Sequence, residues 1–134
     1  MIERLIIDTL LLDDEINKYT NGNIFVLCSP EGTPTPYIVV TADNHADDLV
    51  IDTFDVVINI YDTKEDKSVT REISEKIRTL LNYTMLNGDE HNSVRIYFRG
   101  RSLIRMPEST LSHLIMTFDG RGINENSINN LINL

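Results

Sequence analysis

The stretch TFDVVINIY, residues 53–61, is the clearest β-strand in the sequence. Its apolar residues alternate with a mixed set: Phe54, Val56, Ile58 and Ile60 against Asp55, Val57, Asn59 and Tyr61. A period of two turns successive side chains to opposite faces of a sheet. We therefore expect one face of this strand to lie against a core and the other to carry mixed polar and apolar side chains.

Amphipathic helices are predicted on both sides of this strand. The nearer one runs from about Glu65 to Tyr83, and its apolar stripe consists of Val69, Ile73, Ile77, Leu80 and Leu81. The other covers Ile2–Tyr19, where apolar residues again recur at helical spacing. The sequence Asn21-Gly22-Asn23 should end it, because Gly and Asn tolerate the left-handed conformation of a helix terminus.

Four further strands are predicted from short β-branched or alternating runs: Ile24–Cys28, Tyr37–Thr41, Val94–Arg99 and Leu111–Phe118. Residues 43–52 are expected to form an acidic connection, and Asp119-Gly120-Arg121-Gly122 should end the last strand. This order favours an α+β fold with a mostly antiparallel sheet of about five strands and two main helices on one face. Residues 1–123 should form a single domain, and the Asn-rich residues 124–134 a tail or a short helix.

The composition is that of an ordinary globular domain. The chain has 134 residues, of which 41% are hydrophobic, and this is enough for a real core. Its one cysteine, Cys28, cannot form an internal disulfide and is expected to be a small buried residue of its apolar run. No signal peptide is recognisable, and no apolar run approaches the roughly 18 residues of a membrane span, so no membrane partner is expected.

The charge is unevenly distributed. The formal net charge is -9, with 7 basic and 18 acidic residues in 1–90 but 5 basic and 3 acidic residues in 91–134. An acidic protein repels phosphate backbones, so specific nucleic-acid binding is not expected. The last third of the chain reads as a mildly basic module on an acidic body.

One cluster, Asp43 to Asp48 with His45, has the residue types of a metal site or of a small metal-dependent enzyme. Its spacing matches no known metal-binding loop, and a solvated acidic loop is the favoured interpretation. Phosphate-binding glycine loops are missing as well. We therefore predict no catalytic residue, no metal and no cofactor, and we keep the metal-binding alternative open.

A basic stripe follows in the last third, consisting of Arg95, Tyr97, Arg99, Arg101 and Arg105. The first three share one face if the strand is regular. The stripe could be a solvated sheet face, a contact for nucleic acid, or an interface with an acidic edge of an identical neighbour. For the last case the predicted acidic partners are Asp43, Asp47, Asp48, Asp52 and Asp55. Contacts between two different patches of one protein are heterologous, and they build rings when the rotation closes.

The order of these features resembles the tail terminators of tailed bacteriophages, also called tail-completion or head–tail joining proteins. An amphipathic helix over Ile2–Tyr19 leads to a short strand, and a proline-containing loop then enters the strand through Pro36-Tyr37-Ile38-Val39-Val40. The strand Phe54–Asp62 is followed at once by the helix Glu65–Leu81, and an arginine-rich strand precedes the final strand with His113–Phe118. The likeness covers roughly residues 1–122.

This resemblance implies a structural protein of the virion tail, assembled in the cytoplasm of the bacterial host, without catalytic activity or organic cofactor. It implies a ring, commonly a hexamer, that caps the tail tube and offers a docking surface to the head connector. The implied partners are further copies of the chain, the major tail-tube protein and a head-completion or connector protein. Another connector or a minor tail protein is the alternative within the same class. The arginine stripe could face either the lumen or a neighbouring subunit.

Overall fold

The computed structural model describes residues 2–47, 51–63, 67–87, 93–104 and 111–123 of the chain, with the side chains of residues 45–47, 51, 52, 67 and 123 outside that description. Its helices are α1 (Ile2–Leu11), α2 (Asp14–Thr20) and α3 (Lys67–Leu81). Its strands are β1 (Ile24–Val26), β2 (Tyr37–Asp47), β3 (Ile51–Thr63), β4 (Met85–Asn87), β5 (Ser93–Ile104) and β6 (Leu111–Ile123).

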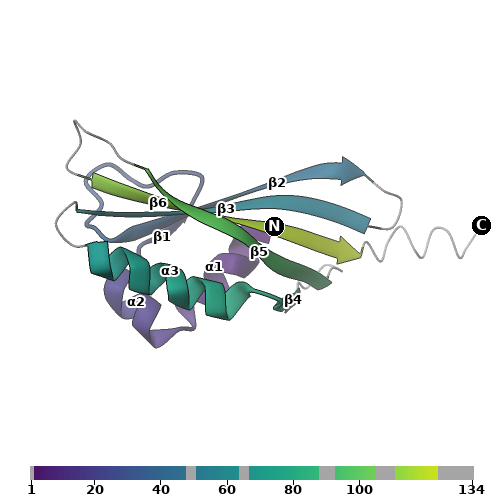
Figure 1. The fold of residues 1–134 in the computed structure, drawn as a ribbon, viewed down its shortest axis with the longest axis horizontal. Coiled ribbons are helices and arrows are strands. Elements are labelled where there is room, and N and C mark those ends of the chain that lie inside the picture. Colours follow the sequence, from purple (N-terminus) through teal and green to yellow (C-terminus); the bar gives the residue numbers. More distant parts are fainter. Residues whose placement is uncertain (1, 48–50, 64–66, 88–92, 105–110, 124–134) are drawn as a thin grey trace, which may run out of the picture.

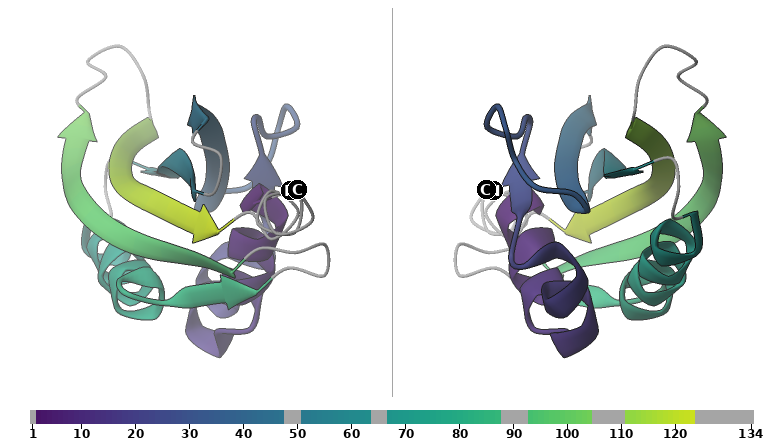
Figure 2. Two further views of the ribbon diagram at one scale, coloured as in Figure 1. Left: turned by 90° about the vertical axis from the view of Figure 1, so that its right-hand side faces the viewer. Right: turned by 90° about the vertical axis from the view of Figure 1, so that its left-hand side faces the viewer.

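The described strands form one sheet in the order β1-β2-β3-β6-β5-β4. Every neighbouring pair is antiparallel except β1 and β2, which run parallel. The three helices lie together on one side of the sheet (Figure 1), which is strongly curled (Figure 2). The predicted α+β class with a mostly antiparallel sheet is confirmed.

The core lies between the helices and the sheet. Alternate residues of β3 and β6, among them Ile58, Ile60, Met116 and Phe118, are fully or almost fully buried, and so are Ile73 and Ile77 of α3. The side chains on this face of the sheet therefore follow the alternation that the sequence of residues 53–61 predicts.

The first predicted helix is in fact two helices. α1 ends at Leu11, and Asp13 caps α2: its Oδ1 accepts hydrogen bonds from the backbone N–H groups of Glu15 (3.0 Å) and Ile16 (2.9 Å). The break turns Leu12, 84% exposed, away from the core. The continuous helix predicted over Ile2–Tyr19 was therefore wrong at residues 12 and 13, where a local capping bond competes with the helix.

The long strands extend beyond their predicted ends. β2 continues to Asp47, so Asp43–Asp47 is strand and not a loop, and β6 continues through Asp119-Gly120-Arg121-Gly122. Both extensions pair with β3, which supplies their backbone hydrogen-bond partners. The polar residues and glycines of these segments do not by themselves indicate a strand. The short strand β4 was not predicted. The tail, residues 124–134, lies outside the described residues.

Cys28 is exposed, so the prediction of a buried cysteine was wrong. β1 ends at Val26, and Leu27 adopts a positive φ of 68° that turns the chain out of the sheet. Leu27 is consequently 72% exposed, and the apolar run of the sequence is longer than the strand that it forms.

Candidate functional site

The face of the sheet opposite the helices, here called the helix-free face, has no helix packed on it within the described residues. Side chains from β2, β3, β6 and β5 form successive rows across this face. In order along the strands, the rows are Tyr37–Tyr61–His113–Ile104, Val39–Asn59–Ile115–Ser102, Thr41–Val57–Thr117–Gly100, Asp43–Asp55–Asp119–Tyr97, and Thr53–Arg121–Arg95. The face therefore changes along the strands from aromatic and apolar, through acidic, to basic.

The aromatic end is an ordered stack. The rings of Tyr37 and Tyr61 lie 5.0 Å apart and those of Tyr61 and His113 4.3 Å apart, with interplanar angles of 23° and 17°. Nε2 of His113 lies 2.7 Å from Oδ1 of Asn59. Such cross-strand aromatic pairs stabilise neighbouring strands. The stack joins three strands on a face that no described helix covers, and it leaves half-buried rings available for contact.

Partial burial perturbs two groups of this stack. It raises the pKa of Tyr61, with a further contribution from Tyr37, and it lowers the pKa of His113, because burial disfavours the charged form of each group. A neutral His113 can donate its Nε2–H to the amide oxygen of Asn59. The stack is therefore expected to hold an uncharged imidazole at neutral pH.

Stability should fall on acidification partly because of His113. A folded-state pKa below that of the unfolded chain gives a contribution that is present above the unfolded value and is lost as the pH falls. The free energy of unfolding is measured by urea titration at about pH 7.5 and about pH 5.5, which bracket the usual histidine pKa. We expect its decrease between these two values to be smaller in His113→Gln than in the wild type. Equal losses in the two proteins would contradict this assignment.

The acidic row is partly neutralised within the chain. Asp43, Asp55 and Asp119 stand side by side on three strands, where like charges repel. Nη1 of Arg99 lies 3.3 Å from Oδ1 of Asp119 and 4.0 Å from Oδ1 of Asp55. One predicted basic residue thus contacts a predicted acidic residue of the same chain. Arg99 already has partners without a neighbouring subunit.

The basic row brings two arginines together. Arg95 of β5 lies directly opposite Arg121 of β6, and both side chains are exposed. Neither forms an ion pair with any of the described residues. Like charges placed opposite each other destabilise a strand pair, and an external carboxylate would relieve this repulsion. Among the described arginines of β5 and β6, these two are therefore the best suited to an external acidic partner.

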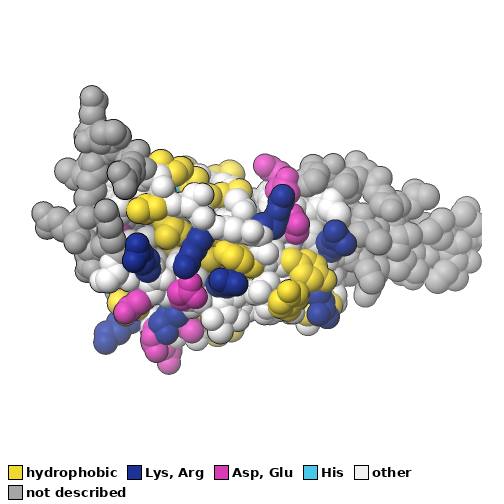
Figure 3. Space-filling model, in the orientation of Figure 1, with side chains coloured by type: hydrophobic (Ala, Val, Ile, Leu, Met, Phe, Trp, Pro, Cys, Tyr) yellow, Lys and Arg dark blue, Asp and Glu magenta, His cyan; other side chains and the backbone are white. Residues whose placement is uncertain are grey.

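A bulge in β5 separates Arg101 from the rest of the stripe. The register shifts between Phe98 and Gly100, and after the shift Arg101 lies opposite the buried Met116. Its side chain therefore lies on the helix side, where Nη1 donates to Oγ of Ser74 (2.8 Å) and the guanidinium pairs with Glu75. Figure 3 shows basic and acidic side chains interspersed over the molecular face on which α3 and β5 lie.

The structure thus brings some predicted site residues together and not others. Arg95, Tyr97 and Arg99 share the helix-free face with Asp43 and Asp55, whereas Arg101 is on the opposite face. Asp47 and Asp52 are strand residues paired with each other, and their side chains are not described. Asp48 and Arg105 lie outside the described residues. The function of all ten positions as an interface remains a prediction.

Two elements of this surface were not recognised from the sequence. Arg121 was assigned to a turn, and the stack of Tyr37, Tyr61 and His113 depends on registers between strands far apart in the chain. The sequence did carry one signal for this stack. The alternation in residues 53–61 places Tyr61 in the mixed, outward-facing set, so an aromatic residue opposite it on a neighbouring strand would contact it.

A pocket of about 320 Å³ lies between the first half of α3 and the second half of β5. Its lining includes Thr70, Arg101, Ser102 and Leu103. Thr70 is 1% exposed, and its Oγ1 has no hydrogen-bond partner among the residues that the structure describes. A buried hydroxyl without a partner is unfavourable, so this pocket offers a hydrogen-bonding group that the described residues leave unused.

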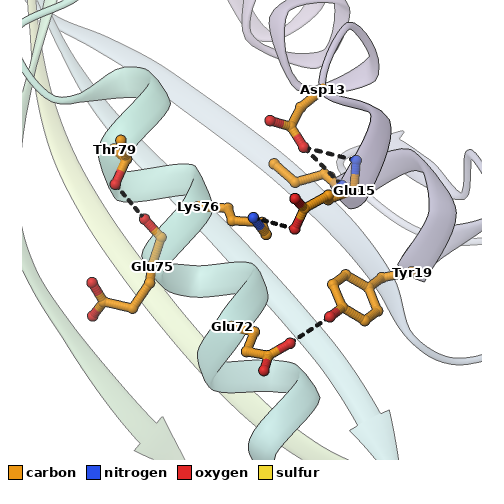
Figure 4. Close-up of polar contacts among 8 residues, drawn as sticks. Asp13, Glu15, Tyr19, Glu72, Glu75, Lys76 and Thr79 are labelled. Carbon is orange, nitrogen blue, oxygen red and sulfur yellow. Dashed lines mark hydrogen bonds and ion pairs between the residues drawn. The ribbon is translucent and has the colours of Figure 1, made fainter.

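A polar seam holds α2 against α3 (Figure 4). The hydroxyl of Tyr19 donates to Glu72, and Lys76 pairs with Glu15. The hydrogen bond to Glu72 raises the pKa of Tyr19, and the bond to Glu15 raises that of Lys76. These groups satisfy one another across the two helices, and the arrangement is that of a surface clamp between helices.

No three His, Cys, Asp or Glu side chains of the described residues form a group that could hold a metal ion. The proposed Asp43–Asp48 loop is a strand as far as Asp47, and its cross-strand neighbours spread its residues along an edge of the sheet. Among the described helices, none is long and apolar enough to cross a membrane.

Comparison with known proteins gives one family. The profile of the family described as tail completion protein gp17 matches residues 4–121. A search of the curated proteins finds none that matches. Since the match covers almost all of the described residues, it includes the whole sheet except the last residues of β6.

Two similar solved structures share the fold. A chain of the virion of a native gene transfer agent particle superposes with a TM-score of 0.78 at 11% identity, over 92% of this chain and 95% of that one. A second solved structure, whose name states no function, gives a TM-score of 0.60 at 11% identity, over 92% of this chain and 90% of its own. At these identities the likeness concerns the fold alone.

Proposed function

The chain belongs to the family of tail completion protein gp17, and from this membership we propose that it is the ring-forming subunit that closes a phage tail tube and joins it to the head. The family places it among the structural proteins of the virion tail. The proposal adds the ring, its position at the end of the tube, and the two partners: the tail-tube protein and a connector protein of the head.

The observation that carries the ring is the separation of charge on the helix-free face. The acidic row and the basic row lie at different levels along the strands of this face. If two copies in the same orientation are offset along the strands, the acidic row of one copy therefore need not lie beside the acidic row of the other. Two different patches of one chain then meet in a heterologous contact, which repeats and can close. The fold shared with a chain of a virion supports this use of the domain.

The net charge is compatible with a ring that encloses DNA without gripping it. With a formal charge of -9 per subunit, the lumen of a ring would repel phosphate groups. The arginines with carboxylate or hydroxyl partners in the chain, Arg99 and Arg101, are already partly engaged. The proposal assigns no catalytic role to any residue.

Mass measurement in solution tests the function directly. We expect the purified chain to form a ring-sized species, at least when the tail-tube protein is present, and to stop tube polymerisation at a defined length. A protein that stays monomeric with tube protein and leaves polymerisation unchanged would overturn the proposal. A ring that binds the connector but not the tube would identify it as another head–tail connector.

Charge reversal at Arg95 should weaken this association. We expect Arg95→Glu to raise the dissociation constant between subunits at least roughly tenfold, since like-charge contacts cost several kcal/mol at interfaces. Reversal of Asp47 and Asp48 in the same chain should restore part of the affinity. Sedimentation velocity at several concentrations measures the change.

The matched control is Lys18→Glu, which changes the net charge equally on an exposed residue of α2 on the helix side. It should leave self-association unchanged. Equal weakening by both variants would indicate a general charge effect and contradict a specific role for Arg95.

A further inference from the structure

Two stretches of sheet edge, on opposite sides of the sheet, have no strand beside them among the described residues. β1 covers the outer edge of β2 only along Ile38–Val40. On the other side, residues 82–87, which include β4, cover the outer edge of β5 only as far as Phe98, whose backbone N–H donates to the side-chain oxygen of Asn82. The second halves, Thr41–Asp47 of β2 and Arg99–Ile104 of β5, therefore present backbone N–H and C=O groups along one side that no other described strand pairs.

The residues of these two open edges are of opposite charge, although Arg99 and Arg101 also pair with carboxylates of their own chain. Arg99 and Arg101 lie on the edge of β5, and Asp43 and Asp47 lie on the edge of β2. Long exposed edges are usually blocked in monomeric proteins, because they pair with other chains. Two open edges of similar length and opposite charge on the two sides of one sheet are suited to pairing between copies of the same chain.

Strand directions also fit such pairing. β2, β3, β6 and β5 alternate in direction, so β2 and β5 run oppositely. A second copy placed head to tail, with the same face outward, sets its β2 antiparallel to β5 of the first. The junction then has the same hydrogen-bond pattern as the neighbouring strand pairs within each chain.

We propose that residues Thr41–Asp47 of one copy pair with the Arg99–Ile104 edge of the next, so that one continuous sheet passes through the ring. The inference rests on the ring of the proposed function and specifies its contact. Residues of the helix-free face must meet residues of that face, and Ser102 is the central outward residue of the open β5 edge. Asp43 is the central outward residue of the open β2 edge, so centring the two edges on each other places Asp43 of the neighbour beside Ser102.

At this register the charged residues interleave. Asp43 of the neighbour lies in the middle of the contact, beside Ser102, and Asp47 lies at one end near Phe98, with Arg99 and Arg101 at levels between the two aspartates. Asn44 of the neighbour falls opposite Arg101, on the helix side, because within its own chain it pairs with the inward Phe54. Its amide is thus placed at the pocket where the hydroxyl of Thr70 has no partner within the described part of its own chain.

The offset between copies is compatible with closure. Ser102 lies in the same row as Val39 of its own chain, so the neighbour is displaced by the four residues from Asp43 to Val39. This is a rise of about 13 Å over four long strands that together span about 19 Å. The corresponding strand tilt is about 35°, within the range of closed β-barrels.

Hydrogen exchange of the unmodified protein tests the contact. In the ring-sized species, isolated with its mass measured on the same sample, amides of residues 41–47 and 99–104 should exchange at least roughly tenfold more slowly than in the dilute monomer. Residues 14–20 of α2 serve as the internal control and should not change. A ring of confirmed mass without protection at either edge would overturn the inference and leave the ring itself standing.

Disulfide trapping provides the second readout. In a Cys28→Ser background, the pair Thr41→Cys and Ile104→Cys occupies facing positions on the helix-free face at the proposed register, within disulfide reach. Oxidation should give a ladder of covalent multimers on a non-reducing gel. The control pair Lys18→Cys and Ile104→Cys should give none above the background of random collisions. Rings that form without the ladder and without edge protection would reject this contact, and absence of any ring would reject it together with the proposed function.

Discussion

Replacement of Phe118 by alanine is expected to lower the free energy of unfolding by about 3–5 kcal/mol. Phe118 is 1% exposed in β6, paired between Val56 of β3 and Phe98 of β5, and its ring meets that of Phe98 edge to face at 5.4 Å. Removal of the ring leaves a cavity in the core between the centre of the sheet and the helices. Because small domains are stable by only about 5–15 kcal/mol, this loss should bring the chain close to unfolding.

Urea titration of the monomer, followed by circular dichroism, measures this effect. The matched control is Leu12→Ala, since Leu12 is 84% exposed and should change stability by no more than about 0.5 kcal/mol. A loss of less than about 1 kcal/mol for Phe118→Ala would mean that the core collapses around the cavity or that Phe118 is packed differently.

Replacement of Gly122 by valine should destabilise the chain by about 1–3 kcal/mol through overpacking. A Cβ at Gly122 would lie 3.0 Å from Cγ2 of Val94 and 3.4 Å from the carbonyl oxygen of Ser93, and the valine methyl groups would need still more room. Gly122 faces the helix side, where the buried Val94 crosses it from β5. The glycine is therefore a packing requirement of the sheet.

Gly100→Val is the control for this substitution. A Cβ at Gly100 meets nothing within 4 Å, and its φ is not in the left-handed region. The valine should be neutral within about 0.5 kcal/mol. Thermal and urea unfolding of both variants under monomeric conditions measures the difference. Equal losses at the two positions would show that backbone propensity, and not contact with Val94, determines the cost.

The alternation in residues 53–61 was sufficient to predict the central strand and its faces, because a strand buried on one side imposes its period on the sequence. The same signal in Val94–Arg99 correctly placed Arg95, Tyr97 and Arg99 on one face. It could not predict that Arg101 lies on the other face, since a bulge in β5 depends on the partner strand and leaves no periodic mark.

Strand ends were the least predictable part. The acidic residues 43–47 and the sequence Asp119-Gly120-Arg121-Gly122 have the composition of loops, yet both are strand because β3 pairs with them on either side. Tertiary pairing overrides local preference there. The rows of the helix-free face arise from the registers of these pairings, which explains why the Tyr–Tyr–His stack was not foreseen.

The bulge of β5 also determines which changes of chain length the domain tolerates. The one extra residue at the bulge determines which face of the sheet each β5 residue after Phe98 lies on. Loss of that residue would rotate Arg101 and Leu103 outward, turn Ser102 and Ile104 toward the helices, and remove the guanidinium from Glu75. A single codon lost here would therefore exchange the inside and the outside of half a strand, whereas most substitutions at the same place would alter only one side chain.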